Sequence, residues 1–312
     1  MPGAGGKTVA QRGFLTGSAC SMGRVIVTGA KGGTGPSIVS AFEAAGWDVL
    51  GLDLKPCAIW ETGYRQVDLR DGASLYDICA GADAIVHFGS LPTDAWTSWH
   101  TAYENLALGG FHVLQAAARL GIQRLVLASS PEIYGDLMRV PYLPVDENSP
   151  AHPDSIYGAA KQNLETLAAH YARWYGIAIA ALRPQRIVYE QSYEWRFRRF
   201  TGDPGAAVDA LWSYVDARDV ASACLAWIES DLSGCEVFNV AADDVCVDVS
   251  TAQLLAEHLP QIRDVRGVLA DRTGLIDCAK LKAMLGWQPQ HHWQQMARES
   301  EQHGFPHDPP VR

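Results

Sequence analysis

The apolar residues of the chain gather in short, nearly continuous runs after residue 23. Five such runs are rich in Val, Ile, Leu and Ala: 24–28, 47–53, 84–88, 125–128 and 177–182. Strands that are buried on both faces of a parallel sheet have this pattern, whereas half-exposed strands alternate apolar and polar residues. The runs therefore predict buried, parallel β-strands.

The segments between these runs have the length and spacing of amphipathic helices. Three of them are followed by a glycine, which readily closes a helix: 36–45, 103–120 and 155–175. Strands that alternate with helices indicate βαβ units, so we expect an α/β fold with a doubly wound parallel sheet of the Rossmann type. The pattern is less regular after residue 183, with helices predicted at 218–229 and 278–285 and a strand at 236–241.

The composition narrows the class of protein. The 312 residues include 25 Lys and Arg against 35 Asp and Glu, a net charge of −10, so nucleic acid is not expected as a partner. Apolar stretches are too short for a membrane span, and no membrane is expected. The seven cysteines form no C-x-x-C pair, so we expect a cytoplasmic protein without a disulfide framework or zinc site. Adjacent His291 and His292 lack a carboxylate at ligand spacing, so no metal is expected there.

The first apolar run leads into a glycine-rich loop that is followed by a predicted helix. Gly29, Gly32 and Gly35 are three residues apart, a spacing that allows a tight turn, close backbone approach to a pyrophosphate and close packing of helix on strand. The helix N-terminus then offers free N–H groups to phosphates. A glycine-rich turn without a ligand is the alternative. The dinucleotide-binding residues expected here are Gly29, Lys31, Gly32, Gly33, Thr34 and Gly35.

An acidic residue, Asp53, ends the second strand, 24 residues after Gly29. A carboxylate at this place accepts hydrogen bonds from the adenosine ribose and repels a 2′-phosphate, which favours NAD over NADP. Lys31 and Lys55 lie nearby and can soften that preference. Asp53 can instead be a turn former at the strand end. Asp68, in the segment 67–71, follows a further strand between the runs at 47–53 and 84–88, and it either accepts a hydrogen bond from the adenine or caps a helix that starts near residue 73.

Tyr157 and Lys161 are four residues apart on a predicted helix and therefore share one face. An ammonium beside a phenol favours the phenolate, so the pKa of Tyr157 is expected to be lowered toward working pH, and Tyr157 becomes a candidate acid/base. Ser130 follows the strand at 125–128, and ligands bind at the carboxyl ends of parallel strands. Its hydroxyl can hydrogen-bond the substrate oxygen that Tyr157 protonates or deprotonates.

These motifs together resemble an extended short-chain dehydrogenase/reductase, and within it the NAD-dependent epimerase/dehydratase family. The resemblance covers nearly all of the chain after residue 23 and includes the segments 214–221, 238–241 and 285–289. It implies NAD as the cofactor, Tyr157 as the acid/base, Lys161 as its electrostatic partner and Ser130 as the clamp on the substrate oxygen. It implies that Asn105, in the helix at 103–120, completes the catalytic site. The further cofactor-binding residues expected are Asp68, Leu69, Phe88, Gly89, Ser90 and Pro184.

Composition and the resemblance together give the expected organisation of the chain. Residues 1–22 are rich in Gly, Ala, Ser and Thr and are expected to be a flexible leader. Residues 23–183 are expected to form an NAD-binding Rossmann domain. Residues 184–312 are expected to form a small C-terminal α/β lobe for the substrate, with some strands and helices returning to the sheet. Family members often pair through the helices at 103–120 and 155–175, so a homodimer is expected.

Three departures from the family pattern bear on the substrate. Members that act on nucleotide-activated sugars often carry R-P-x-N-V-Y-G-P, where this chain has 183–190 with Arg186 in place of Asn. Asp216 lies only 33 positions after Arg183, which indicates a shortened lobe that is similar to that of uronate dehydrogenases. Sugar-nucleotide dehydratases often have Asp or Ser before the glutamate, whereas this chain has Pro131 before Glu132. Proline cannot protonate a leaving hydroxyl, which argues against a dehydratase. Glu132 remains a possible base.

A guanidinium at position 186 is a fixed fork for a carboxylate or phosphate, so we expect an anionic group on the substrate. Arg196 is a second candidate contact, although 195–200 can equally be an amphipathic segment with a solvated basic edge. The alternative for Arg186 is a salt bridge to Glu190 or Asp216.

The leading hypothesis is an NAD-dependent oxidoreductase acting on a secondary alcohol or ketone of a sugar or sugar acid. The first alternative is a sugar-nucleotide epimerase, or less readily a dehydratase, with tightly held NAD. The second is a sensor that binds NAD without turnover.

Overall fold

The computed structural model describes residues 23–58, 61–91, 98–201 and 203–303. The expected leader at 1–22 lies outside the described residues. Within them, a parallel sheet has the strand order β3-β2-β1-β4-β5-β6-β9. The strands are β1 (Arg24–Thr28), β2 (Asp48–Asp53), β3 (Tyr64–Gln66), β4 (Ala84–His87), β5 (Arg124–Ala128), β6 (Ala178–Pro184) and β9 (Cys235–Val240). The expectation of a doubly wound parallel sheet is confirmed.

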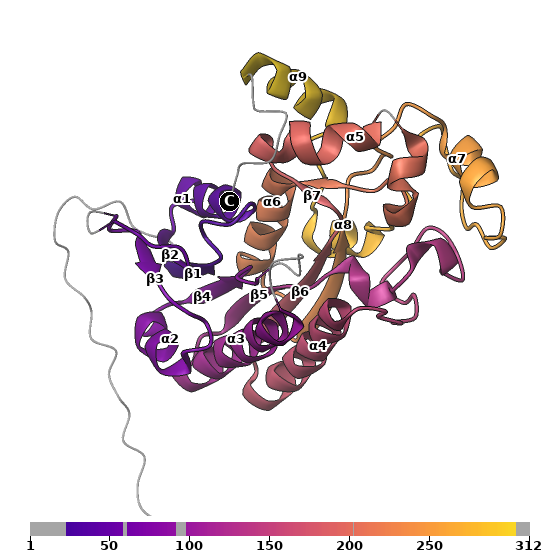
Figure 1. Cartoon of the computed structure of the whole chain (residues 1–312). Helices are drawn as coiled ribbons and strands as arrows, with labels where there is room; N and C mark the ends of the chain where they lie inside the picture. Colours follow the sequence, from indigo (N-terminus) through magenta and orange to yellow (C-terminus); the bar gives the residue numbers. More distant parts are fainter. Residues whose placement is uncertain (1–22, 59–60, 92–97, 202, 304–312) are drawn as a thin grey trace, which may run out of the picture.

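Helices cover both faces of this sheet (Figure 1). On one face α1 (Gly35–Ala44) packs against α6 (Ala217–Ile228), and on the other face α3 (Trp99–Leu120) lies between α2 (Gly72–Cys79) and α4 (Ile156–Tyr175). Each layer has its own buried apolar cluster, because successive side chains of a strand point to opposite faces. The strand order reverses between β1 and β4, and this is the point at which open α/β sheets bind ligands.

The two long helices begin at serine caps and end at glycines. Ser98 accepts a hydrogen bond from the Thr101 amide, so α3 begins before residue 103, where the apolar pattern placed its start. Ser155 caps α4 in the same way, and Gly121 and Gly176 close the helices in the left-handed region. These caps fix the position of the residues that α3 and α4 carry to the sheet edge.

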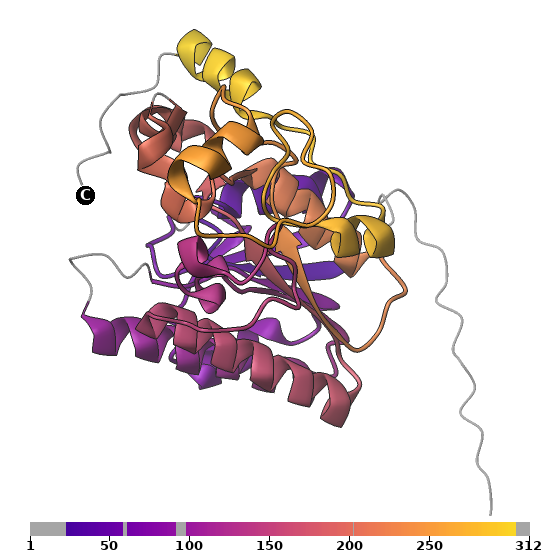
Figure 2. The same cartoon turned by 90° about the vertical axis from the view of Figure 1, so that its right-hand side faces the viewer.

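The part of the chain after β6 forms a lobe above the carboxyl edge of the sheet (Figure 2). Its elements are β7 (Ile187–Val188), paired with β8 (Val215–Asp216), and the helices α5 (Arg198–Thr201), α7 (Thr251–His258), α8 (Ala279–Leu285) and α9 (Trp293–His303), with short 3₁₀ turns and a π-helical turn at Tyr193–Phe197. Trp212 and Tyr214 are fully buried in it. β9 and α6 lie in the layers of the main sheet, so the lobe and the sheet share one continuous core.

Strand β6 continues two residues beyond the expected strand at 177–182. Pro184 still pairs with Val240 of β9, and the Gln185 amide donates to the Val240 carbonyl at 2.9 Å. The strand thus ends at Pro184, and the next residue supplies the donor that proline lacks. Among the described helices, none combines the length and apolar character that a membrane span requires.

Candidate functional site

The glycine loop joins β1 to α1 in a turn that only glycine fits at two positions. Gly29 has φ +72°, and a Cβ there would lie 2.8 Å from the Phe88 carbonyl carbon and the Gly89 nitrogen. A Cβ on Gly35 would lie 2.2 Å from the Gly29 oxygen. The loop is therefore folded tightly on itself and against the end of β4, as the motif predicts.

The N-terminus of α1 has no side-chain cap among the described residues. Thr34 occupies the N-cap position but makes no side-chain cap hydrogen bond. The first amides of a helix lack intrahelical acceptors, so they can bind a pyrophosphate here. The loop therefore fits the phosphates of a dinucleotide.

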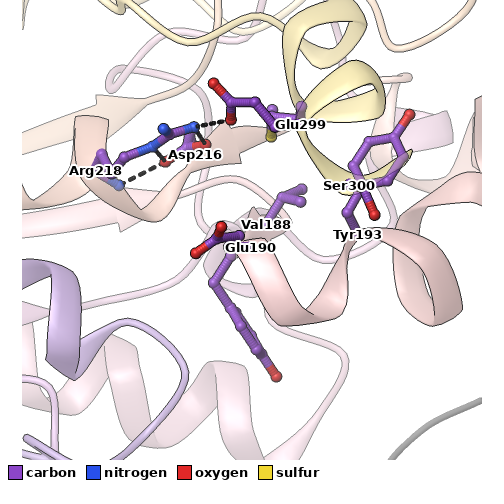
Figure 3. Close-up of a pocket in the computed structure, with 9 residues that line it drawn as sticks. Val188, Glu190, Tyr193, Asp216, Arg218, Glu299 and Ser300 are labelled. Atoms are coloured by element: carbon purple, nitrogen blue, oxygen red, sulfur yellow. Dashed lines mark hydrogen bonds and ion pairs between the residues drawn. The ribbon is translucent and has the colours of Figure 1, made fainter. Parts of the chain in front are cut away.

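Tyr189 packs directly against this loop, which the sequence did not indicate. A Cβ on Gly33 would lie 2.4 Å from the Tyr189 ring. The extra glycine in the motif therefore gives room for this ring. Tyr189 also lines a small pocket that borders α9, together with the residues labelled in Figure 3: Val188, Glu190, Tyr193, Asp216, Arg218, Glu299 and Ser300.

Asp53 lies beside the glycine loop, held by backbone amides. Its two carboxylate oxygens accept hydrogen bonds from the Lys31 amide at 2.8 Å and the Lys55 amide at 2.9 Å. The carboxylate is thus fixed beside the glycine loop. Asp68, in contrast, pairs with Arg70 at 2.7 Å.

The capping alternative for Asp68 is wrong, because Asp71 caps α2 by accepting a hydrogen bond from the Ser74 amide. Leu69 is buried, and its side chain packs on Gly89, where a Cβ would lie 2.7 Å from the Leu69 Cδ1. The structure therefore brings Leu69 and Gly89, both expected at the cofactor, into contact.

Tyr157 and Lys161 meet at the carboxyl end of β5. Lys161 is buried, its Nζ donates to the Ala128 carbonyl at 2.7 Å, and it lies 5.4 Å from the centre of the Tyr157 ring. The hydroxyls of Ser130 and Ser90 hydrogen-bond to the Tyr157 hydroxyl. Four of the expected site residues thus converge on one point, where a substrate oxygen can exchange a proton.

The charges at this point differ from the expectation. Burial raises the pKa of Tyr157 to about 12, the negative charge of Glu132 raises it further, and the two serine hydrogen bonds only partly oppose this. The expected lowering of the Tyr157 pKa is therefore wrong for this structure, because desolvation of the phenolate outweighs the nearby ammonium. Burial lowers the pKa of Lys161 to about 8, against the opposing charges of Glu132 and Glu165.

Asn105 supports the loop that follows β4. It is buried in α3, and its side-chain oxygen accepts a hydrogen bond from the Leu91 amide at 2.8 Å. This bond lies one residue beyond Ser90, which contacts Tyr157. The hydrogen bond shown for Asn105 therefore positions the loop that carries Ser90.

A buried polar network behind the site was not predicted. Glu165, four residues after Lys161, accepts two hydrogen bonds from the Arg183 guanidinium at 2.8 and 2.7 Å and one from the Ser129 hydroxyl at 2.5 Å. Arg183 also donates to the Tyr134 hydroxyl at 2.8 Å. Ser129 is thus turned to the network, whereas its neighbour Ser130 is turned to Tyr157. The helical i, i+4 spacing from Lys161 is the signal that could have marked Glu165.

The candidate substrate residues have different surroundings. Glu132 is exposed and accepts a hydrogen bond from the Ser155 hydroxyl at 2.6 Å. Arg186 pairs with Asp209 at 2.9 Å and stacks 3.8 Å from the centre of the Phe200 ring. Its Nη1 is buried and has no hydrogen-bond partner among the residues that the structure describes. The side chain of Arg196 lies outside the described residues, although its backbone is in the π-helical turn.

Arg186 forms a salt bridge, but with neither of the two partners expected from the sequence. Asp216 pairs with Arg218 at 2.8 Å, and the partner of Arg186 is Asp209. Neither Glu190 nor Asp216 is paired with Arg186 in the ion pairs of the described residues. His291 hydrogen-bonds to buried Asp219 at 2.8 Å, so it is anchored to the protein. No cluster of three or more metal-ligating side chains occurs in the described ranges.

A search of protein families matches residues 25–241 to the NAD dependent epimerase/dehydratase family. A uronate dehydrogenase of Pseudomonas putida is 34% identical over 167 residues, covering 51% of this chain and 59% of that protein. A UDP-glucose 4-epimerase of Neisseria meningitidis is 27% identical over 183 residues, covering 52% of this chain and 53% of that protein. The aligned part thus spans somewhat more than half the length of these curated relatives.

A solved structure with a similar fold is a short-chain dehydrogenase/reductase superfamily protein of Agrobacterium tumefaciens with bound NAD. It has a TM-score of 0.70 and 23% sequence identity, and the match covers 89% of this chain and 96% of that one. This likeness supports the fold.

Proposed function

The chain belongs to the NAD-dependent epimerase/dehydratase family, and on that premise we propose that it is an NAD-dependent dehydrogenase of a small, anionic, sugar-like secondary alcohol. The convergence of Ser130, Tyr157 and Lys161 at the carboxyl edge of the sheet carries this proposal. A positioned acid/base beside a nucleotide site is what hydride transfer to or from an alcohol requires.

The residues of the chain handle the proton. Tyr157 with its raised pKa is a protonated phenol at neutral pH, so it can donate to a ketone oxygen held by Ser130. In the oxidative direction Tyr157 must accept the alcohol proton, for which it must first be a phenolate. The Lys161 ammonium favours this phenolate. NAD, when bound, supplies the hydride acceptor and a positive charge near the phenol. Because the Lys161 ammonium is fixed on the Ala128 carbonyl, it can act on Tyr157 without moving.

The surroundings of Arg186 support an anionic substrate. The guanidinium is mostly buried, yet Asp209, its ion-pair partner, has a side chain that is 66% exposed, so solvent weakens that pair. Among the described residues Nη1 has no hydrogen-bond partner, which leaves its N–H groups for a carboxylate. The short segment between Arg183 and Asp216 favours a small substrate, and the uronate dehydrogenase among the relatives is named for an acidic sugar.

A sugar-nucleotide epimerase is the second candidate, favoured by the relative named UDP-glucose 4-epimerase. It shares the oxidation step and differs in returning the hydride to the other face. Arg186, where sugar-nucleotide enzymes of the family often carry Asn, and the shortened lobe favour the dehydrogenase. A sensor without turnover has no use for the assembled Ser130, Tyr157 and Lys161.

Kinetics of Arg186→Ala test the substrate class. One charge-assisted hydrogen bond contributes about 1.5–3 kcal/mol, so KM for a hexuronate should rise at least tenfold, while KM for the neutral aldose should not change. Arg266→Ala is a matched control, because Arg266 also pairs with an aspartate at 2.9 Å and stacks 3.4 Å from a tyrosine ring centre, away from the site. Equal KM values for wild type and Arg186→Ala would contradict the anionic substrate.

Pairing of two chains belongs to the same proposal. Helices α3 and α4 lie side by side and leave large apolar side chains exposed: Trp99, Tyr103, Phe111, Ile156 and Trp174. A second copy of this face would cover them, as the expected homodimer requires. Sedimentation velocity should show a dimer, and Trp174→Glu should shift it toward monomer. We also propose a cytoplasmic location, which the six described, free cysteines support.

A further inference from the structure

A second acidic residue, Glu61, lies beside the glycine loop at the β2–β3 edge of the sheet. The Lys31 Nζ donates to Glu61 Oε2 at 2.8 Å and to the Pro56 carbonyl at 3.3 Å, and it lies 5.0 Å from the centre of the Tyr64 ring. Glu61 Oε2 also accepts a hydrogen bond from the Ala58 amide at 2.7 Å. The ammonium is therefore held in the loop that follows β2.

Lys31 begins next to the carboxylate that faces the ribose. Its own backbone amide donates to Asp53 Oδ2 at 2.8 Å, so its side chain leaves the backbone at the adenosine end of the dinucleotide site. The four methylene groups of a lysine give the ammonium a wide range of positions around that point. A 2′-phosphate on the ribose would lie beside Asp53. The Lys31 ammonium could reach that phosphate if it were not paired with Glu61.

We propose that Glu61 is a residue that determines cofactor specificity, because it holds Lys31 in an ion pair and so withholds its charge from the 2′-phosphate of NADP. Asp53 repels that phosphate directly, and Glu61 removes the cation that would compensate. The pairing is mutual: the hydrogen bond to Glu61 raises the pKa of Lys31, and the hydrogen bond to Lys31 lowers the pKa of Glu61. Lys55 is occupied as well, because its Nζ donates to the Lys31 carbonyl at 2.9 Å.

This inference rests on the proposed placement of the adenosine ribose at Asp53. Glu61→Gln removes the charge but keeps an oxygen that can accept from the Ala58 amide, so the loop keeps its support. Glu61→Ala releases Lys31 in a second way. Glu236→Gln is a matched control, because Glu236 pairs with Lys280 at the same 2.8 Å distance and similar exposure, on β9 at the opposite edge of the sheet.

Isothermal titration calorimetry of the full chain with NAD⁺ and NADP⁺ at low salt measures the ratio of the two affinities. We expect Glu61→Gln to improve NADP⁺ binding about tenfold with NAD⁺ binding unchanged within twofold, since one charge-assisted hydrogen bond becomes available. The gain should vanish in the double variant Lys31→Met/Glu61→Gln and should be absent in Glu236→Gln.

Two results would overturn the role of Glu61: an unchanged ratio in both Glu61→Gln and Glu61→Ala, or a gain that persists when Lys31 is also replaced. Asp53→Asn separates this from the proposed function. If Asp53→Asn leaves the ratio unchanged, the ribose is not at Asp53. If Asp53→Asn shifts the ratio and the Glu61 variants do not, the ribose placement stands and the role of Glu61 fails.

Discussion

Replacement of Glu165 by alanine should destabilise the protein far more than the loss of an ordinary ion pair. Glu165 receives two hydrogen bonds from Arg183 and one from Ser129, and the side chains of the pair are only 11% and 7% exposed. Without the carboxylate, a buried guanidinium keeps its desolvation cost and loses its bidentate acceptor. Breaking a buried pair in this way costs about 3–5 kcal/mol of unfolding free energy.

Glu236→Ala serves as the control for this experiment. It breaks a single contact of similar length to Lys280, but those side chains are 31% and 34% exposed, and such surface pairs contribute about 0–1 kcal/mol. Urea unfolding monitored by tryptophan fluorescence gives the free energy of unfolding of each variant. The double variant Glu165→Leu/Arg183→Met should recover part of the loss, because no buried charge remains. If Glu165→Ala and Glu236→Ala lose the same free energy within 1 kcal/mol, the network does not stabilise the fold as described.

Three further changes should have measurable effects. Tyr157→Phe should lower kcat about 100- to 10,000-fold while NAD affinity stays within a few-fold, and turnover at the wild-type rate would show that the motif is incidental. Gly33→Val should weaken NAD binding in calorimetry, because a Cβ would lie 2.4 Å from the Tyr189 ring, and the added Tyr189→Ala should restore much of it. Burial lowers the pKa of His87 from 6.5 to about 3. As the pH drops below 6.5, His87 is therefore protonated in the unfolded state but not in the folded state, and the stability of the fold decreases. Between pH 7 and pH 5 the free energy of unfolding, measured with urea, should fall by about 2 kcal/mol because of His87. His87→Gln should not show this loss. An equal pH dependence of unfolding in the wild type and in His87→Gln would contradict the buried, neutral His87.

The features that could be predicted from the sequence are those set by local spacing. Buried parallel strands appear as apolar runs, the glycine spacing fixes the turn into α1, and Tyr157 and Lys161 share a helix face because they are four residues apart. The start of α3 at Trp99 was missed because the cap at Ser98 lies before the periodic apolar pattern.

The remaining features depend on which segments the fold brings together. Arg186 finds Asp209 across an irregular part of the lobe, where no periodic pattern gives the distance between them. The pairing of Glu165 with Arg183 needs α4 to lie on β6. The pKa of Tyr157 was predicted in the wrong direction because spacing reveals the neighbouring charge but not the burial of the phenol.

Absorbance at 340 nm, which reports NADH, tests the proposed function most directly. The 312-residue chain with NAD⁺ should reduce the cofactor in net amounts when a hexuronate is added, and Tyr157→Phe should abolish this signal. A UDP-hexose should give neither net NADH nor its 4-epimer under the same conditions. Interconversion of UDP-glucose and UDP-galactose without net NADH, together with no reaction of any free acidic sugar, would contradict the dehydrogenase and establish the epimerase instead.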